Sequence, residues 1–146
     1  MKAVLLLALR ATTGALLIVW GAMKVFEPAH AIVISDKFYS KTLSAEALQA
    51  PLGIAEMVLG GLVVLGLLRR IVYPLQAIVL CVAALSIWKY LLDPLGLWLL
   101  THETRNYLFF PSSTVAVATL VLLAFKEHDR LSLDCVLFRR RSSISG

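Results

Sequence analysis

Four long apolar stretches divide the chain, and charged residues or prolines separate them. They cover residues 4–26, 52–68, 71–92 and 108–125. A helix that crosses a bilayer needs about 20 mostly apolar residues, so each stretch predicts one transmembrane helix. The second and fourth stretches are short, which indicates little tilt or a few added flanking residues. The pattern predicts an all-α membrane protein built as a four-transmembrane-helix bundle.

The five prolines support these limits. Pro28 follows the first stretch and Pro94 follows the third. Pro51 and Pro111 open the second and fourth stretches, and Pro74 falls in the first turn of the third. Proline is tolerated in a first helical turn and just beyond a last one, because no helical N–H bond is lost there. We therefore expect no proline in the middle of a span.

Composition agrees with a membrane protein. Of 146 residues, 60% are hydrophobic and 16% are charged, and the mean hydropathy is +0.85. Soluble domains have about half apolar and about a quarter charged residues. The net charge of +5 does not indicate nucleic-acid binding, because the basic residues lie at helix ends and in the tail. The two cysteines, Cys81 and Cys135, form no CxxC pair, so no dithiol redox centre is expected.

Orientation is predicted from the basic residues that flank the spans. One side carries Lys2, Arg69, Arg70, Lys126, Arg130, Arg139, Arg140 and Arg141. The other carries only Lys37, Lys41 and Arg105, offset by acidic residues. The positive-inside rule then predicts that both termini are cytoplasmic in a multi-pass protein of the cell membrane, the inner membrane if the protein is bacterial.

The segments outside the spans give weaker expectations. Residues 1–130 are expected to form the transmembrane domain, and residues 131–146 a basic, flexible tail, with the chain already loose from Lys126. In the outer loop, Ser44 is expected to cap a short helix over residues 45–49. The apolar residues 94–100 are too few to span and are expected in the membrane interface.

Polar residues inside the spans are the strongest functional signal, because they are costly in lipid. Arg10, Gly14, Leu17, Gly21 and Lys24 recur at steps of four and three, which places them on one helix face. That face should contact protein, since glycine permits close helix approach. In the second span, a matching face is predicted for Gly53, Glu56 and Gly60.

A ligand pocket is predicted at the outer ends of the first three spans. We expect Lys24 to pair with Glu56, and Lys89 and Asp93 to converge on the same place. The ligand-binding residues would be Lys24, Glu56, Lys89, Asp93, Trp20 and Trp88, with Glu27, His30, His102, Glu103 and Arg105 above them. The alternative is that Lys24, Lys89 and Asp93 extend to the interface from helix ends. No metal site is assigned, because His30, His102 and Glu103 match no ligand spacing, and no catalytic residue is identified.

The chain resembles the DoxX-like family of small four-helix membrane proteins over roughly residues 5–126. The resemblance lies in the first-span pattern of Arg10, Gly14, Gly21-Ala22-Met23-Lys24 and Pro28, in Glu56 and Gly60, and in Phe110-Pro111. It implies a four-helix bundle associated with redox systems, since some members are subunits of thiosulfate:quinone oxidoreductase and relatives assist redox-enzyme maturation. Electron transfer would then need a bound quinone or a partner subunit.

Three functions follow as expectations. The first is a redox-associated subunit, an accessory rather than an independent enzyme, that binds a quinone or a similar amphipathic molecule. Lys24 and Lys89 would donate hydrogen bonds to it, Glu56 would orient Lys24 or relay a proton, and the tryptophans would form apolar walls. The second is a scaffold that holds a partner membrane subunit, or forms a homo-oligomer, through its small-residue faces. The third is a carrier for a small solute.

Overall fold

The structure is a computed structural model that describes residues 1–38, 46–101 and 103–135. Its long helices are α1 (Lys2–Phe26), α3 (Glu46–Leu65), α4 (Arg69–Ser86) and α6 (Pro111–Ala124). The shorter ones are α2 (Pro28–Phe38), α5 (Trp88–Leu92), and two 3₁₀ turns, η1 (Tyr107–Phe109) and η2 (Lys126–His128). The described residues contain no strand. Four segments are long and apolar enough to cross a membrane, which confirms the predicted four-span all-α fold: Lys2–Phe26, Glu46–Leu65, Arg69–Ser86 and Tyr107–Ala124.

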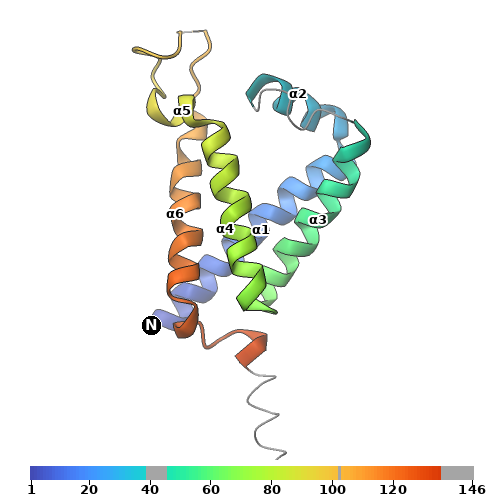
Figure 1. Ribbon diagram of the computed structural model, residues 1–146, viewed down its shortest axis with the longest axis vertical. Coiled ribbons are helices and arrows are strands. Elements are labelled where there is room, and N and C mark those ends of the chain that lie inside the picture. Colours follow the sequence, from blue (N-terminus) through green and yellow to red (C-terminus); the bar gives the residue numbers. More distant parts are fainter. Residues whose placement is uncertain (39–45, 102, 136–146) are drawn as a thin grey trace, which may run out of the picture.

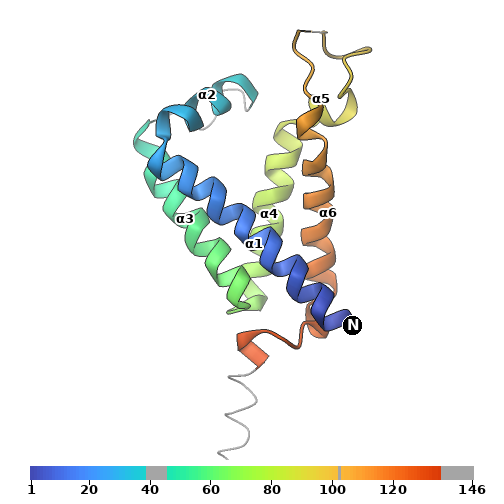
Figure 2. The same cartoon turned by 180° about the vertical axis from the view of Figure 1, so that it is seen from behind.

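The long helices form two pairs that spread apart like a V (Figure 1). Helix α1 packs along α3, and α4 packs along α6; these two pairs share the most extensive contacts between elements. The pairs converge where the N-terminus and η2 lie, which we call the terminal end, and spread where α2 and α5 lie, which we call the loop end (Figures 1 and 2). The two pairs are therefore farthest apart at the loop end (Figures 1 and 2).

Glycines hold α1 and α3 together at backbone contact. A Cβ atom built on Gly53 would lie 2.6 Å from the carbonyl oxygen of Gly21. One built on Gly14 would lie 2.8 Å from the carbonyl oxygen of Gly60. Neither distance leaves room for a side chain, so the two antiparallel helices fit together only because these positions are glycine. The predicted matching of the two glycine faces is confirmed.

Apolar side chains are distributed between the interior and the outer surface as expected for a protein in lipid. One apolar cluster links the two helix pairs, and its fully buried members include Leu17, Val63, Tyr73 and Leu122. Large apolar side chains such as Leu85, at 69% exposure, cover the outside of the helices. In water such a surface would be unfavourable, whereas around membrane-spanning helices it is the surface that contacts the bilayer.

Several predicted boundaries are wrong. Pro51 and Pro74 do not lie in first turns but inside α3 and α4, where each removes one helical hydrogen bond. The third predicted span stops at Ser86, because Ile87 leaves the helical conformation (φ −104°, ψ 24°) before α5 resumes. Residues 46–49 begin α3 rather than forming a separate helix, while Ser44 lies outside the described residues.

Helix α2 was not predicted. Pro28 was interpreted only as the end of the first span, but it also begins α2, as proline does at a first helical position. A single residue, Glu27, with φ −132° and ψ 60°, separates the two helices. The chain therefore turns at the loop end and lays α2 across it (Figures 1 and 2).

The segment after α6 packs beneath the bundle, so the expectation of a loose chain from Lys126 is wrong for residues 126–135. Asp129 and Ser132 are fully buried. The Asp134 carboxylate accepts hydrogen bonds from the backbone N–H groups of Leu68 (3.1 Å), which precedes α4, and Arg69 (2.9 Å), its first residue. An acid at a helix N-terminus satisfies free N–H groups and complements the helix dipole. Residues 136–146 lie outside the described residues, and the division at residue 130 stays a prediction.

Candidate functional site

A cavity of about 740 Å³ occupies the space between the two helix pairs towards the loop end. Helices α1, α2, α3 and α4 and the 3₁₀ turn η1 all contribute to its wall. Most of the lining is aliphatic or aromatic, and five residues bring polar groups: Lys24, Ser35, Gln49, Glu56 and Ser86. A large apolar cavity with few polar groups is typical of a small-molecule site.

Lys24 and Glu56 form an ion pair in the cavity wall, which confirms the predicted pairing. The Lys24 Nζ donates to Glu56 Oε1, and the two side chains are 15% and 17% exposed. The second carboxylate oxygen, Oε2, is buried and has no hydrogen-bond partner among the residues that the structure describes. The pair is held at this depth because Gly21 and Gly53, one turn away on each helix, bring α1 and α3 into contact.

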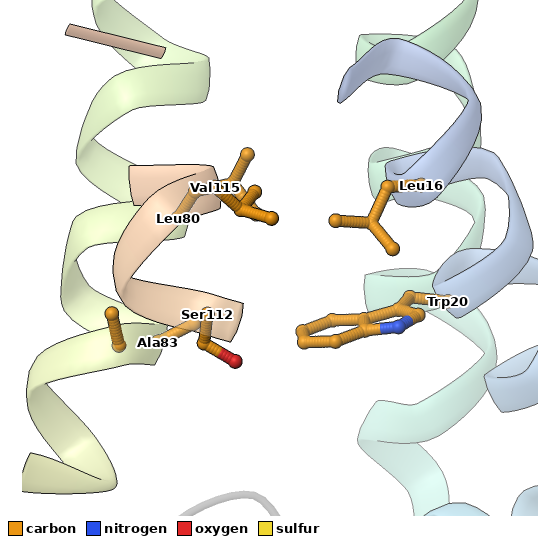
Figure 3. Close-up of a pocket in the computed structure, with 7 residues that line it drawn as sticks. Leu16, Trp20, Leu80, Ala83, Ser112 and Val115 are labelled. Carbon is orange, nitrogen blue, oxygen red and sulfur yellow. The ribbon is translucent and has the colours of Figure 1, made fainter. Parts of the chain in front are cut away.

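Trp20 lies at the junction between this cavity and a second, smaller one. It lines both, together with Leu80 and Ala83 of α4. Figure 3 shows the Trp20 ring and Leu16 reaching from α1 towards Ser112 and Val115 of α6. Trp20 is therefore placed as an apolar wall of the cavity, on the side that faces α6.

Three of the predicted ligand-binding residues do not line the cavity: Trp88, Lys89 and Asp93. Trp88 and Lys89 are exposed on α5, and the Lys89 Nζ lies 5.9 Å from the centre of the Trp88 ring. This is the geometry of a cation–π contact. The structure does not bring these three side chains to Lys24 and Glu56.

Asp93 instead organises the loop that follows α5. Its buried carboxylate accepts four successive backbone N–H groups at 2.7–3.0 Å, those of Leu97, Trp98, Leu99 and Leu100. Burial opposes the charged form of Asp93, but the four N–H donors outweigh it and hold its pKa well below the usual range. The leucines and Trp98 of the loop point outwards and are mostly exposed.

The residues above the cavity differ from those predicted. Ala31, Ile34 and Ser35 of α2 line it, and Gln49 contributes from the first turn of α3. The predicted residues Glu27, His30, Glu103 and Arg105 are exposed, and none lines the cavity. His102 lies outside the described residues. The sequence signal for these α2 residues was the spacing of Ala31 and Ile34 after Pro28, which places them on one helix face.

A second polar cluster is buried at the terminal end. Arg10 is 2% exposed, and its Nη1 lies 2.9 Å from Asp129 Oδ2. Its Nη2 donates to the Leu131 carbonyl at 3.1 Å, and the Tyr73 hydroxyl also donates to Asp129 Oδ2. Arg10 was expected on the protein-facing side, which is confirmed, but its partners were missed. The available signal was that Asp129 follows the last span, at the same end of the bundle as Arg10.

A family model described as DoxX matches residues 5–88. The matched region contains most of α1 and all of α2, α3 and α4, with Lys24, Glu56, Trp20 and all four packing glycines. Searches of curated proteins and of solved structures find no match.

Proposed function

Because the chain belongs to the DoxX family, we propose that it is a redox-associated membrane subunit that binds a quinone or a similar amphipathic molecule between its two helix pairs. The observation that carries this proposal is the cavity of about 740 Å³ with one ion pair in an otherwise largely apolar wall. An amphipathic molecule matches that distribution, since its tail needs apolar surface and its head needs a few polar partners.

Each residue around the ion pair has a distinct role in the proposal. The ammonium group of Lys24 has three N–H donors, and Glu56 takes one of them. The remaining donors can bind a carbonyl or an anionic oxygen of the head group. Glu56 fixes the position of Lys24 and offers a carboxylate oxygen for proton exchange. Trp20 provides a flat apolar wall against which a ring can stack.

The lining also supports entry from the bilayer. Ala55 of α3 and Ile78 and Val82 of α4 line the cavity and are exposed. These two helices are joined by a short turn at the terminal end and spread apart beyond it (Figure 1). A hydrophobic ligand dissolved in the membrane would therefore reach the ion pair sideways, with its tail left between α3 and α4.

The accessory role and the location are part of the same proposal. We place the terminal end in the cytoplasm because the basic residues are concentrated there, which puts the cavity in the outer leaflet of the cell membrane. Electron transfer would be performed by a partner redox subunit. A scaffold acting through small-residue faces is less well supported, because Gly14, Gly21, Gly53 and Gly60 already pack against each other.

The test is mass spectrometry of the gently purified protein, comparing wild type with a variant whose cavity is filled. Ala83→Phe adds a ring in the cavity wall, and Ala15→Phe adds the same ring on an exposed face of α1 as the matched control. We expect a quinone, a quinol or another amphipathic molecule in roughly stoichiometric amount in wild type and Ala15→Phe, and its loss in Ala83→Phe. Equal contents of ordinary phospholipid in all three proteins, and nothing else, would contradict the proposal.

A further inference from the structure

The loop that follows α5, residues 94–100, presents apolar side chains to its surroundings. The segment carries no charged residue, and Leu97 and Trp98 are 75% and 69% exposed. Leu95 and Leu99, on either side of them in the sequence, are also exposed. Exposed apolar side chains gathered in one short segment mark a surface that contacts protein or lipid.

The backbone of the same loop finds its partners within the chain. The Asp93 carboxylate, 1% exposed, accepts the four N–H groups of residues 97–100 at 2.7–3.0 Å. The Gly96 N–H donates to the Asp93 carbonyl (3.3 Å), and the left-handed conformation of Gly96 (φ 71°) turns the chain back over the carboxylate. The Thr101 N–H donates to Thr104 Oγ1 at 3.0 Å. Every N–H group from Gly96 to Thr101 therefore has an acceptor, which lowers the cost of moving this irregular segment out of water.

The loop also lies at the depth where the hydrocarbon core of a bilayer ends. Helix α4 begins at Arg69, and its 18 residues span about 27 Å, close to the core thickness of about 30 Å. Helix α5 and the loop follow it at the loop end (Figure 1). Leu85, near the end of α4, is exposed on the surface that contacts lipid, whereas the exposed residues that follow the loop, Glu103 and Arg105, are charged. The apolar segment thus lies between a lipid-facing helix surface and charged residues, where interfacial tryptophans are usually found.

From these observations we infer that residues 94–100 insert into the phospholipid interface at the loop end, and that the Asp93 carboxylate permits this by binding the N–H groups of residues 97–100. The partner of this surface is the boundary between phospholipid head groups and acyl chains, because the loop continues the lipid-facing surface of α4. The inference is independent of the proposed function, since none of these residues lines the cavity. The loop connects α4 to α6, so its insertion anchors that pair at the end where the two pairs are farthest apart.

The experiment measures the depth of a nitroxide label by electron paramagnetic resonance, in liposomes of phosphatidylethanolamine and phosphatidylglycerol. The label is attached at Leu97→Cys in the full chain, with Cys81→Ala and Cys135→Ala to prevent labelling elsewhere. Oxygen concentrates in the bilayer and a nickel chelate stays in water, so the ratio of their collision rates with the label reports its depth. Leu85→Cys provides a control in lipid, and Glu103→Cys one in water. We expect the ratio at Leu97→Cys to lie between the two controls and several times above that at Glu103→Cys.

Asp93→Asn tests the part assigned to the carboxylate. Asparagine has nearly the same size but one acceptor oxygen instead of two, so it cannot hold all four N–H groups. The ratio at Leu97→Cys should then fall towards that at Glu103→Cys, while the ratio at Leu85→Cys stays unchanged because α4 still spans the bilayer. Glu103→Gln, which changes an exposed acid after the same loop, should leave the label at Leu97→Cys at its original depth.

Three results would overturn the inference. A ratio at Leu97→Cys as low as that at Glu103→Cys, with Asp93 intact, would place the loop in water. Low collision rates with both reagents would show that protein, such as a second copy of the chain, covers it. An unchanged ratio at Leu97→Cys in Asp93→Asn would remove the role of the carboxylate. The first two results do not depend on the stability of Asp93→Asn, because they are measured with Asp93 in place.

Discussion

Arg10, near the start of the chain, and Asp129, 119 residues later, form an ion pair from which water is excluded. Their side chains are 3% and 0% exposed, and Tyr73 donates a third polar contact from α4. Since Arg10 belongs to α1 and Tyr73 to α4, the Asp129 carboxylate joins the two helix pairs at the end where they converge. The cavity opens at the other end, so this contact holds the two helix pairs together at the end away from the cavity.

Removing one member of this pair should destabilise the protein more than removing both. Asp129→Asn or Arg10→Met alone leaves a buried group uncompensated, and we expect a loss of roughly 3 kcal/mol in the free energy of unfolding. The double variant should regain part of that loss. Thermal unfolding in detergent measures all four proteins. Additive losses in the double variant would show that the two residues act independently.

Two truncations test the packing of the last described segment. Ending the chain at Cys135 preserves every contact that residues 126–135 make with the rest of the described chain, and we expect the melting temperature to stay at its wild-type value. Ending it at Leu133 removes Asp134, which caps α4, and should cost about 1 kcal/mol. Asp134→Asn in the full chain isolates the carboxylate. An unchanged melting temperature in the shorter protein would mean that the cap contributes nothing to stability.

The glycine contacts between α1 and α3 can be tested with a built-in control. A Cβ on Gly53 would meet the Gly21 carbonyl, Val25 and Lys24, whereas one on Gly61 meets no atom within 4 Å. We expect Gly53→Ala to destabilise the protein by about 1–3 kcal/mol. Gly61→Ala should be neutral or stabilising by up to about 1 kcal/mol, because alanine favours the helix. Equal effects on the unfolding midpoint would argue against backbone contact at Gly53.

Asp93 should protect the backbone of its loop in a pH-dependent way. Its pKa in the folded protein lies below its ordinary value of about 4, so the charged form is the one that stabilises the loop. That stability is present above pH 4 and decreases as the pH falls below it. At pH 6, Asp93→Asn should speed amide hydrogen exchange at residues 97–100, and Glu103→Gln, a change of an exposed acid, should not. Slow exchange in both variants would refute this role.

Reporter fusions test the proposed orientation. Fusions that end at Arg130 should give a cytoplasmic signal, and a fusion at Ser40 should give an external one, because the basic residues are concentrated at the terminal end. The control is the Ser40 fusion in a Lys2→Glu variant. This substitution reduces the difference in basic residues between the two ends of the bundle. A cytoplasmic signal at Ser40 in the unaltered protein would move the cavity to the inner leaflet.

The helix faces were predictable because they depend on local periodicity. The steps of three and four residues from Arg10 to Lys24 identify one face of α1 without any knowledge of the partner helix. The facing glycines in the second span then lead directly to the Lys24–Glu56 pair. The helix face and the ion pair are both present in the structure, because a helix carries its side chains at fixed angles.

The remaining parts depend on contacts that periodicity does not encode. The Arg10–Asp129 pair joins residues 119 positions apart, and the acid lies outside any span. Asp93 was predicted to face a ligand, since its spacing from Lys89 fits one helix face, but the helix ends at Leu92 and the carboxylate turns to the backbone beyond it. The cavity itself depends on the angle between the two helix pairs, which no short segment of sequence determines.

The Arg10–Asp129 pair also has a consequence for biogenesis. The ribosome makes Arg10 first and Asp129 after all four spans, so α1 enters the membrane before its partner exists. An unpaired arginine at the centre of a membrane helix costs about 2.5–3.5 kcal/mol on insertion scales, and less near an end. Until residues 126–135 emerge, Arg10 has no acidic partner, and its cost in lipid is lowest if the guanidinium extends to the membrane interface. Pairing with Asp129 then fixes the first helix at its final depth, so residues 126–135 complete the assembly of the bundle.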